Sequence, residues 1–217
     1  MSNERVQFFG TFINIARMHW ATAQTNKEKL PSLLNKLSQL TGDDADYFNH
    51  IEVDPIEDLI DHHCMIIIVS CAFALEGYIN DYAGRNLSDS FIEDIDKLDL
   101  VSKWIIIPQL VTGKKFPKDG RAYQLLKQLV SDRNFLAHPK STSLFVYDEK
   151  AKKLVVSPKL IRMHEFHQSL FEKAQNAINA LNELSLVMEN LDPEEYTSFH
   201  LDEMVGRSKQ HLDDYGI

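Results

Sequence analysis

The sequence predicts an all-α protein, an antiparallel bundle of four or five principal helices with a small β-hairpin insertion. Apolar residues recur at three- and four-residue steps through most of the chain, the spacing of one helical face. Only residues 144–156 instead show two β-rich runs around a polar turn. We expect 217 residues to form a single domain, with a core at about 54–191, a helical extension at 1–50 and an acidic tail at 192–217.

Two helical stretches are expected in the N-terminal part. The first covers residues 4–24, and residues 27–40 form a second helix or a continuation, with Pro31 tolerated near a helix start. The first stretch carries its apolar residues at helical spacing: Val6, Phe9, Phe12, Ile13, Ala16 and Trp20. Residues 41–46 are predicted to be an acidic break.

The most buried helix is expected to follow this break. Asp54 and Pro55 have the residue types of an N-cap and a first helical position. The helix should run to about Ala83, where Gly84 provides a C-terminal stop. Because Met65–Leu75 is apolar on nearly all sides, this helix should lie at the centre of the bundle.

The second half should contain shorter elements. Residues 86–99 are polar and predict one or two helical turns, and residues 100–110 predict a helix broken or kinked at Pro108. A loop at 114–120 leads to the next helix. After the hairpin, Pro158 should begin one last long helix that ends at about Leu191.

An arginine lies where a core residue is expected in the helix that follows the loop. The apolar face comprises Ala122, Leu125, Leu126, Leu129 and Val130, and the same step reaches Arg133. An unpaired buried charge costs several kcal/mol. Arg133 should therefore meet a carboxylate, with Glu76 and Asp81 as candidates, or open onto a cleft that holds an anion.

His138 closes the same helix, because Pro139 disfavours α-helical geometry in the residue before it. Arg133 and His138 would diverge by about 140° on a regular helix. They can share one site only if the helix unwinds at its end or a second chain contributes.

The segment Arg133-Asn134-Phe135-Leu136-Ala137-His138 resembles the signature of the HEPN superfamily, an arginine followed after four to six residues by histidine. The polar residue after the arginine and the proline stop belong to the resemblance. Residues 70–80 also resemble the central helix of such domains, and the likeness covers about 54–191. A second match to the bare pattern, Arg162 to His167, lacks this context.

The resemblance implies a HEPN-like helical domain that acts as a metal-independent endoribonuclease, a toxin or antiviral-defence component. The RNA 2′-hydroxyl would attack the adjacent phosphate with His138 as general acid or base. Arg133 would hold the phosphate, Asn134 would orient His138 or the phosphate, and Lys140 would contact the RNA backbone. HEPN sites are typically composite, so a homodimer with a shared site is expected. The alternative is a non-catalytic module that binds a nucleotide or a protein, with a nucleotidyltransferase or antitoxin as possible partner.

Charge is unevenly distributed along the chain. The net charge is −9, but residues 103–162 hold 13 Lys and Arg against 4 Asp and Glu, a local +9 that leaves −18 elsewhere. This basic region contains the Arg133–His138 segment and fits a surface that binds RNA. A solvated basic face without a partner is the alternative.

The remaining sequence features predict a cytoplasmic protein without a membrane segment or cofactor. Cys64 and Cys71 lie two helical turns apart, about 10 Å, which predicts two reduced core thiols. The first residues show no signal-peptide pattern, and Met65–Leu75 is too short to span a bilayer. His164 and His167 share one helical face, but no further ligand joins them at metal-binding spacing, so they are interpreted as core or cleft-edge histidines.

Overall fold

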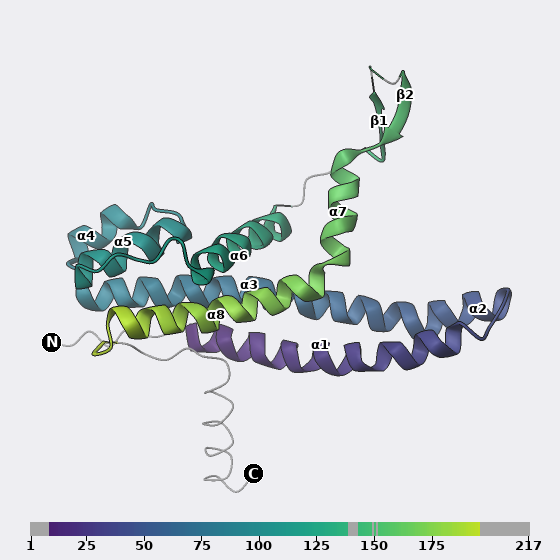
Figure 1. Ribbon diagram of the computed structural model, residues 1–217, viewed down its shortest axis with the longest axis horizontal. Coiled ribbons are helices and arrows are strands. Elements are labelled where there is room, and N and C mark those ends of the chain that lie inside the picture. Colours follow the sequence, from purple (N-terminus) through teal and green to yellow (C-terminus); the bar gives the residue numbers. More distant parts are fainter. Residues whose placement is uncertain (1–8, 139–142, 149, 151, 196–217) are drawn as a thin grey trace, which may run out of the picture.

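The structure is a computed structural model that describes residues 9–138, 143–148, 150 and 152–195. The described residues are mostly helical, with one two-stranded antiparallel sheet, which confirms the all-α class (Figure 1). The elements in chain order are α1 (Phe9–Leu37), α2 (Asp43–Phe48), the π-helix η1 (Asn49–Val53), α3 (Asp54–Asn86), α4 (Asp89–Ile95), α5 (Leu100–Thr112), α6 (Arg121–Ala137), β1 (Phe145–Asp148), β2 (Lys153–Val156), α7 (Pro158–Gln168) and α8 (Leu170–Leu191).

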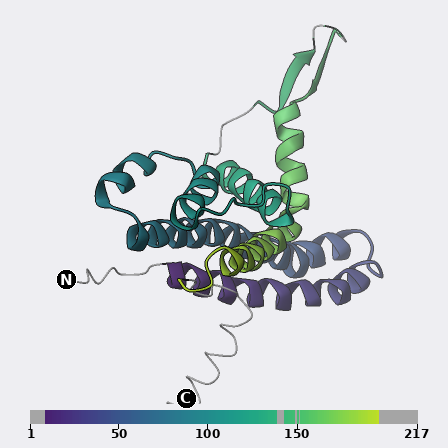
Figure 2. The same cartoon turned by 60° about the vertical axis from the view of Figure 1, so that its left-hand side comes forward.

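Helix α3 is the central helix, as its apolar sequence predicts. It lies beside α1 and α8 along the long axis of the molecule, and α6 packs on another side (Figures 1 and 2). Thirteen of its residues are buried, including Ile67, Leu75 and Tyr78. Helix α1 contributes Ile13, Trp20 and other residues to the same buried cluster, so α1 is part of the core, whereas α2 has no buried residue.

Several predicted helix ends prove wrong because tertiary packing overrides local signals. Asp54 is not an N-cap: its backbone is helical (φ −52°, ψ −44°), and helix continues without interruption from Asp43 to Asn86 through the π-turn η1. The break lies at residues 38–42 rather than 41–46, and it ends at Gly42, whose positive φ of 63° suits glycine. Gly84 lies inside α3, and Pro108 lies inside α5, which continues to Thr112.

The last helix is two helices, not one. The break is at Ser169 (φ −100°, ψ 8°), whose hydroxyl donates to the carbonyl oxygens of Glu165 (2.9 Å) and Phe166 (3.1 Å). Helix α7 therefore rises away from the bundle, and the hairpin lies at its far end (Figures 1 and 2). The hairpin was predicted, and its register pairs Phe145 with Val156 and Asp148 with Lys153.

Helix Asp43–Asn86 is long and apolar enough to cross a membrane by length and composition, since its most apolar stretch of 18 residues has a mean hydropathy of 1.6. Half of that stretch is buried inside the bundle, as in the core helix of a soluble protein. The finding is therefore weak evidence for a membrane span. Cys64 and Cys71 are both free and buried, as predicted, and burial raises the pKa of the Cys64 thiol to about 12.

Candidate functional site

The candidate site lies at the C-terminal end of α6. Helix α6 packs its apolar face, including Ala122, Leu126 and Leu129, against α3 and α8. It ends at Ala137, and His138 already has non-helical geometry (φ −123°, ψ 59°). The N–H of His138 still donates to the carbonyl of Asn134 (3.1 Å), so the histidine stays close to the last turn.

Arg133 faces α3, where Glu76 is its predicted partner. The Arg133 Nη2 lies 4.0 Å from the Glu76 Oε2, and the two side chains are 24% and 38% exposed. The Arg133 Nε is buried, and no described residue accepts a hydrogen bond from it. The buried Nε thus has no acceptor among the described residues, while Nη2 lies near a carboxylate that is 38% exposed.

Asn134 and His138 open into a pocket between α6 and α7, which we call the α6–α7 pocket. Its volume is about 570 Å³. Its walls are largely apolar and its polar groups come from both helices; the lining residues are Met65, Ser131, Asn134, Phe135, Leu136, His138, Lys159, Met163, Phe166 and His167.

Arg133 is not among the described residues that line this pocket, although His138 is. The two side chains therefore serve different sides of α6, as the spacing of about 140° predicts.

Asp132, which the sequence pattern did not single out, anchors the helix that carries the site. This carboxylate is 4% exposed and lies between α6 and α8. Its Oδ1 accepts from the Lys173 Nζ (2.9 Å) and from the Gln128 Nε2 (2.9 Å). The buried ion pair holds α6 against α8 and so fixes the direction of Arg133 and Asn134.

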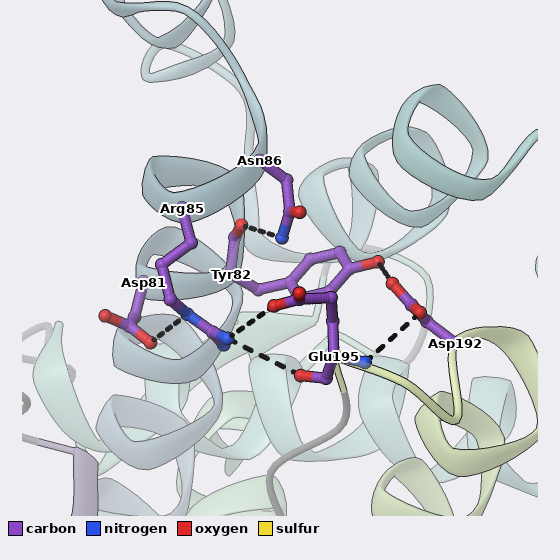
Figure 3. Close-up of polar contacts among 6 residues, drawn as sticks. All are labelled: Asp81, Tyr82, Arg85, Asn86, Asp192 and Glu195. Carbon is purple, nitrogen blue, oxygen red and sulfur yellow. Dashed lines mark hydrogen bonds and ion pairs between the residues drawn. The ribbon is translucent and has the colours of Figure 1, made fainter. Parts of the chain in front are cut away.

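Asp81, the other expected partner of Arg133, instead pairs with Arg85 on its own helix, at 3.1 Å (Figure 3). Arg85 also reaches the Glu195 carboxylate (3.4 Å), and the Tyr82 hydroxyl donates to Asp192 (2.5 Å). Burial, reinforced by Asp192, raises the pKa of Tyr82. This cluster fastens the end of α8 to α3, which is a structural role.

A second pocket of about 410 Å³ adjoins the first, and His167 lines both. The His167 Nδ1 lies 3.6 Å from the Asp61 Oδ2, and burial raises the pKa of Asp61 while the nearby His167 opposes this rise. His164 also lines this second pocket and contacts Gln168 (2.8 Å). Both are cleft-edge histidines, as interpreted from the sequence. Within the described ranges, no three His, Cys, Asp or Glu side chains form a group that could hold a metal ion.

Lys159 and Phe166 line the α6–α7 pocket but were not singled out from the sequence, and His167, interpreted only as a core or cleft-edge histidine, was not expected to lie in the same pocket as His138. They reach the pocket because the chain turns at Ser169, and no glycine or proline marks that turn. Lys140, expected to contact RNA, lies outside the described residues.

Comparisons of this chain with protein-family models, with curated proteins and with solved structures yield no match.

Proposed function

We propose that this chain is a metal-independent endoribonuclease of HEPN type, acting as a toxin or a component of antiviral defence. The α6–α7 pocket carries the proposal. His138, Asn134 and Lys159 all line it, together with aromatic and aliphatic side chains. The pocket is large enough for a nucleotide. A titratable imidazole, a cation and an apolar wall are what an RNA-cleaving site needs for proton transfer, phosphate binding and base stacking.

The proposed reaction uses RNA as its own nucleophile. The 2′-hydroxyl attacks the adjacent phosphorus, and the bond from phosphorus to the 5′-oxygen breaks. The 2′-hydroxyl gives up a proton as it attacks, and the departing 5′-oxygen takes one up. His138 carries out one of these two transfers, and Asn134 holds the imidazole or the phosphate by hydrogen bonding. Arg133 offsets the charge that grows on the phosphate.

Because Arg133 is not among the described residues that line the pocket of its own chain, we assign this role to Arg133 of a second subunit. A suitable surface is the open face of α3, defined by Leu59, Ile66 and Phe73, which are 39%, 39% and 40% exposed. Their spacing of seven residues places them in one stripe. Glu76, one turn beyond Phe73, contacts Arg133, and Met65, next to Ile66, lines the pocket. This face therefore adjoins the part of the site that holds Arg133.

The proposed working unit is a homodimer formed through this face, with Arg133 of each copy directed to the pocket of the other. Subunit mixing tests it. A chain carrying Arg133→Ala and a chain carrying His138→Ala should each be inactive alone and should regain activity when mixed, because one of the two composite sites is then intact. Full specific activity in a protein that stays monomeric at the assay concentration would contradict the shared site.

Incubation of purified protein with labelled RNA in EDTA tests the function itself. Cleavage should persist under chelation and leave 2′,3′-cyclic phosphate or 3′-phosphate ends, because 2′-hydroxyl attack needs no metal-bound water. His138→Ala is the control for a contaminating nuclease. Activity that is lost in EDTA and restored by a divalent ion would refute the mechanism.

The contact between Arg133 and Glu76 favours a second candidate, a non-catalytic module that binds a nucleotide or a protein. There, Arg133 is a structural or ligand-holding residue, and the net charge of −9 suits a protein partner such as a nucleotidyltransferase. Nucleotide binding without RNA cleavage by the wild-type protein would favour this candidate. A cytoplasmic location remains a prediction under both.

A further inference from the structure

The proposed cleavage reaction moves two protons. The bond between the 2′-oxygen and phosphorus forms as the 2′-hydroxyl gives its proton to a base. The bond between phosphorus and the 5′-oxygen breaks, and that oxygen receives a proton from an acid. Each proton-transfer group contributes typically 10²–10⁴-fold to a rate. The sequence motif supplies one histidine, His138, so one of the two groups is unassigned.

We propose that His167 is the second proton-transfer group, acting beside His138 of the same chain. This inference rests on the proposed function. His138 comes from the end of α6 and His167 from the last turn of α7, and both line the α6–α7 pocket. Since the two residues come from different helices, a phosphodiester bound in the pocket can meet one imidazole at each reacting oxygen.

Asp61 on α3 positions His167. Its Oδ2 lies at ion-pair distance from the His167 Nδ1, 3.6 Å. A carboxylate at one ring nitrogen fixes the orientation of the imidazole and leaves the other, Nε2, for exchange with substrate. The exposed fractions of 48% for His167 and 37% for Asp61 leave the ring accessible.

The charges around the pocket suit a phosphate. Lys159 contributes a positive charge, and no carboxylate is among the described residues that line the pocket. The carboxylates near His167 lie instead in the adjoining pocket. The titratable and charged groups that line these two pockets with His167 are Asp61 and Glu57 from α3, Lys27 from α1, His138 from α6, and Lys159 and His164 from α7.

The aromatic wall indicates the class of substrate. Phe135 and Phe166 stack with their ring centroids 4.2 Å apart and an interplanar angle of 22°, and Phe135 is 40% exposed. Stacking of a base on an aromatic side chain is worth about 1–3 kcal/mol. A base must be unpaired to reach this wall, so the substrate is a single-stranded stretch of RNA.

The test is single-turnover cleavage, in EDTA, of a short RNA with one cleavable linkage. His167→Ala should lower the rate by about 10²–10⁴-fold, and Asp61→Asn should lower it less. His164→Ala is the matched control, because this histidine lies one turn away on α7 and lines only the adjoining pocket. It should keep the wild-type rate, and thermal melting should show all three variants folded.

A second substrate separates proton transfer from a structural role. When sulfur replaces the bridging 5′-oxygen, the leaving group no longer needs an acid. The variant that lacks the acid, either His138→Ala or His167→Ala, should then recover to within about tenfold of wild type, while the other stays slow. Asp61→Asn should show the same pattern as His167→Ala, a slower rate on the oxygen substrate and the same recovery, or lack of it, on the sulfur substrate.

Two results would overturn the inference alone: wild-type cleavage that is undiminished in His167→Ala, or a loss that the sulfur substrate restores in neither histidine variant. A wild-type protein that cleaves no RNA would overturn the proposed function as well.

Discussion

Replacement of Lys173 by methionine tests the buried ion pair that sets the direction of α6. The Lys173 Nζ lies 2.9 Å from the Asp132 Oδ1, and the two side chains are 19% and 6% exposed. Methionine keeps most of the packing volume but removes the charge. Asp132 is then left buried with only the hydrogen bond from Gln128.

The expected loss is about 3 kcal/mol in the free energy of unfolding at pH 7. Removing one partner of a buried pair costs about 3–5 kcal/mol, and the low end applies because Gln128 still donates to the carboxylate. Asp132→Leu should cost less, because the Lys173 stem lets its ammonium reach water. The double variant Asp132→Leu, Lys173→Met removes both charges and should be more stable than Lys173→Met alone.

Urea unfolding, followed by the fluorescence of Trp20 and Trp104, measures these differences. A matched control is the exposed ion pair between the same two helices, Arg121 and Glu183, with nitrogen and oxygen 3.7 Å apart and side chains 66% and 35% exposed. Arg121→Met should cost no more than about 1 kcal/mol. A loss of less than about 1 kcal/mol in Lys173→Met, or a double variant no more stable than it, would refute this reasoning.

Three further predictions concern Arg133, His63 and the cysteines. Arg133→Ala should abolish RNA cleavage yet cost no more than about 1 kcal/mol in urea unfolding, because its contact with Glu76 is long, 4.0 Å, and the two side chains are 24% and 38% exposed; a loss above about 3 kcal/mol would mark a buried structural pair. Burial, with the neighbouring charges of His19 and His62, lowers the pKa of His63 below its usual 6.5. As the pH falls, the unfolded chain therefore takes up a proton at this residue before the folded protein does. The free energy of unfolding should then fall as the pH drops from 6.5 through the folded pKa. The urea midpoint should show this fall between pH 7.5 and pH 5.5, and His63→Asn should reduce it. Iodoacetamide at pH 8 should modify Cys64 and Cys71 only after denaturation, because both thiols are buried and burial raises their pKa values; rapid labelling of the native protein would contradict this.

Helical periodicity predicted the α-helices well because it reflects which faces are buried. The centre of the bundle follows from this periodicity, whereas the end of α6 near His138 follows from Pro139 and the hairpin from its two β-rich runs. Other local end signals were less reliable. Asp54 and Pro55 look like a helix start, but α1 packs against this segment and helix continues through a π-turn. Packing outweighs a capping preference worth about 1 kcal/mol.

The candidate site was predictable only in part. The divergence of Arg133 and His138 follows from helix geometry, and the contact with Glu76 follows from the cost of a buried charge. The place of His167 does not, because it depends on the turn at Ser169, where the surrounding sequence continues to favour helix. An unbroken helix from Pro158 to Leu191 would place His167 elsewhere relative to α6.

The turn at Ser169 also separates one wall of the α6–α7 pocket from the main core. Phe166 is the only buried residue of α7, whereas α8 contributes ten. Segments with little buried apolar surface open at lower free energy than the rest of a protein. Backbone amides of α7 and the hairpin should therefore exchange with deuterium through local opening, while those of α3 and α8 should exchange only when the whole chain unfolds. The pocket could then admit and release a bound strand without disturbing the bundle beneath it.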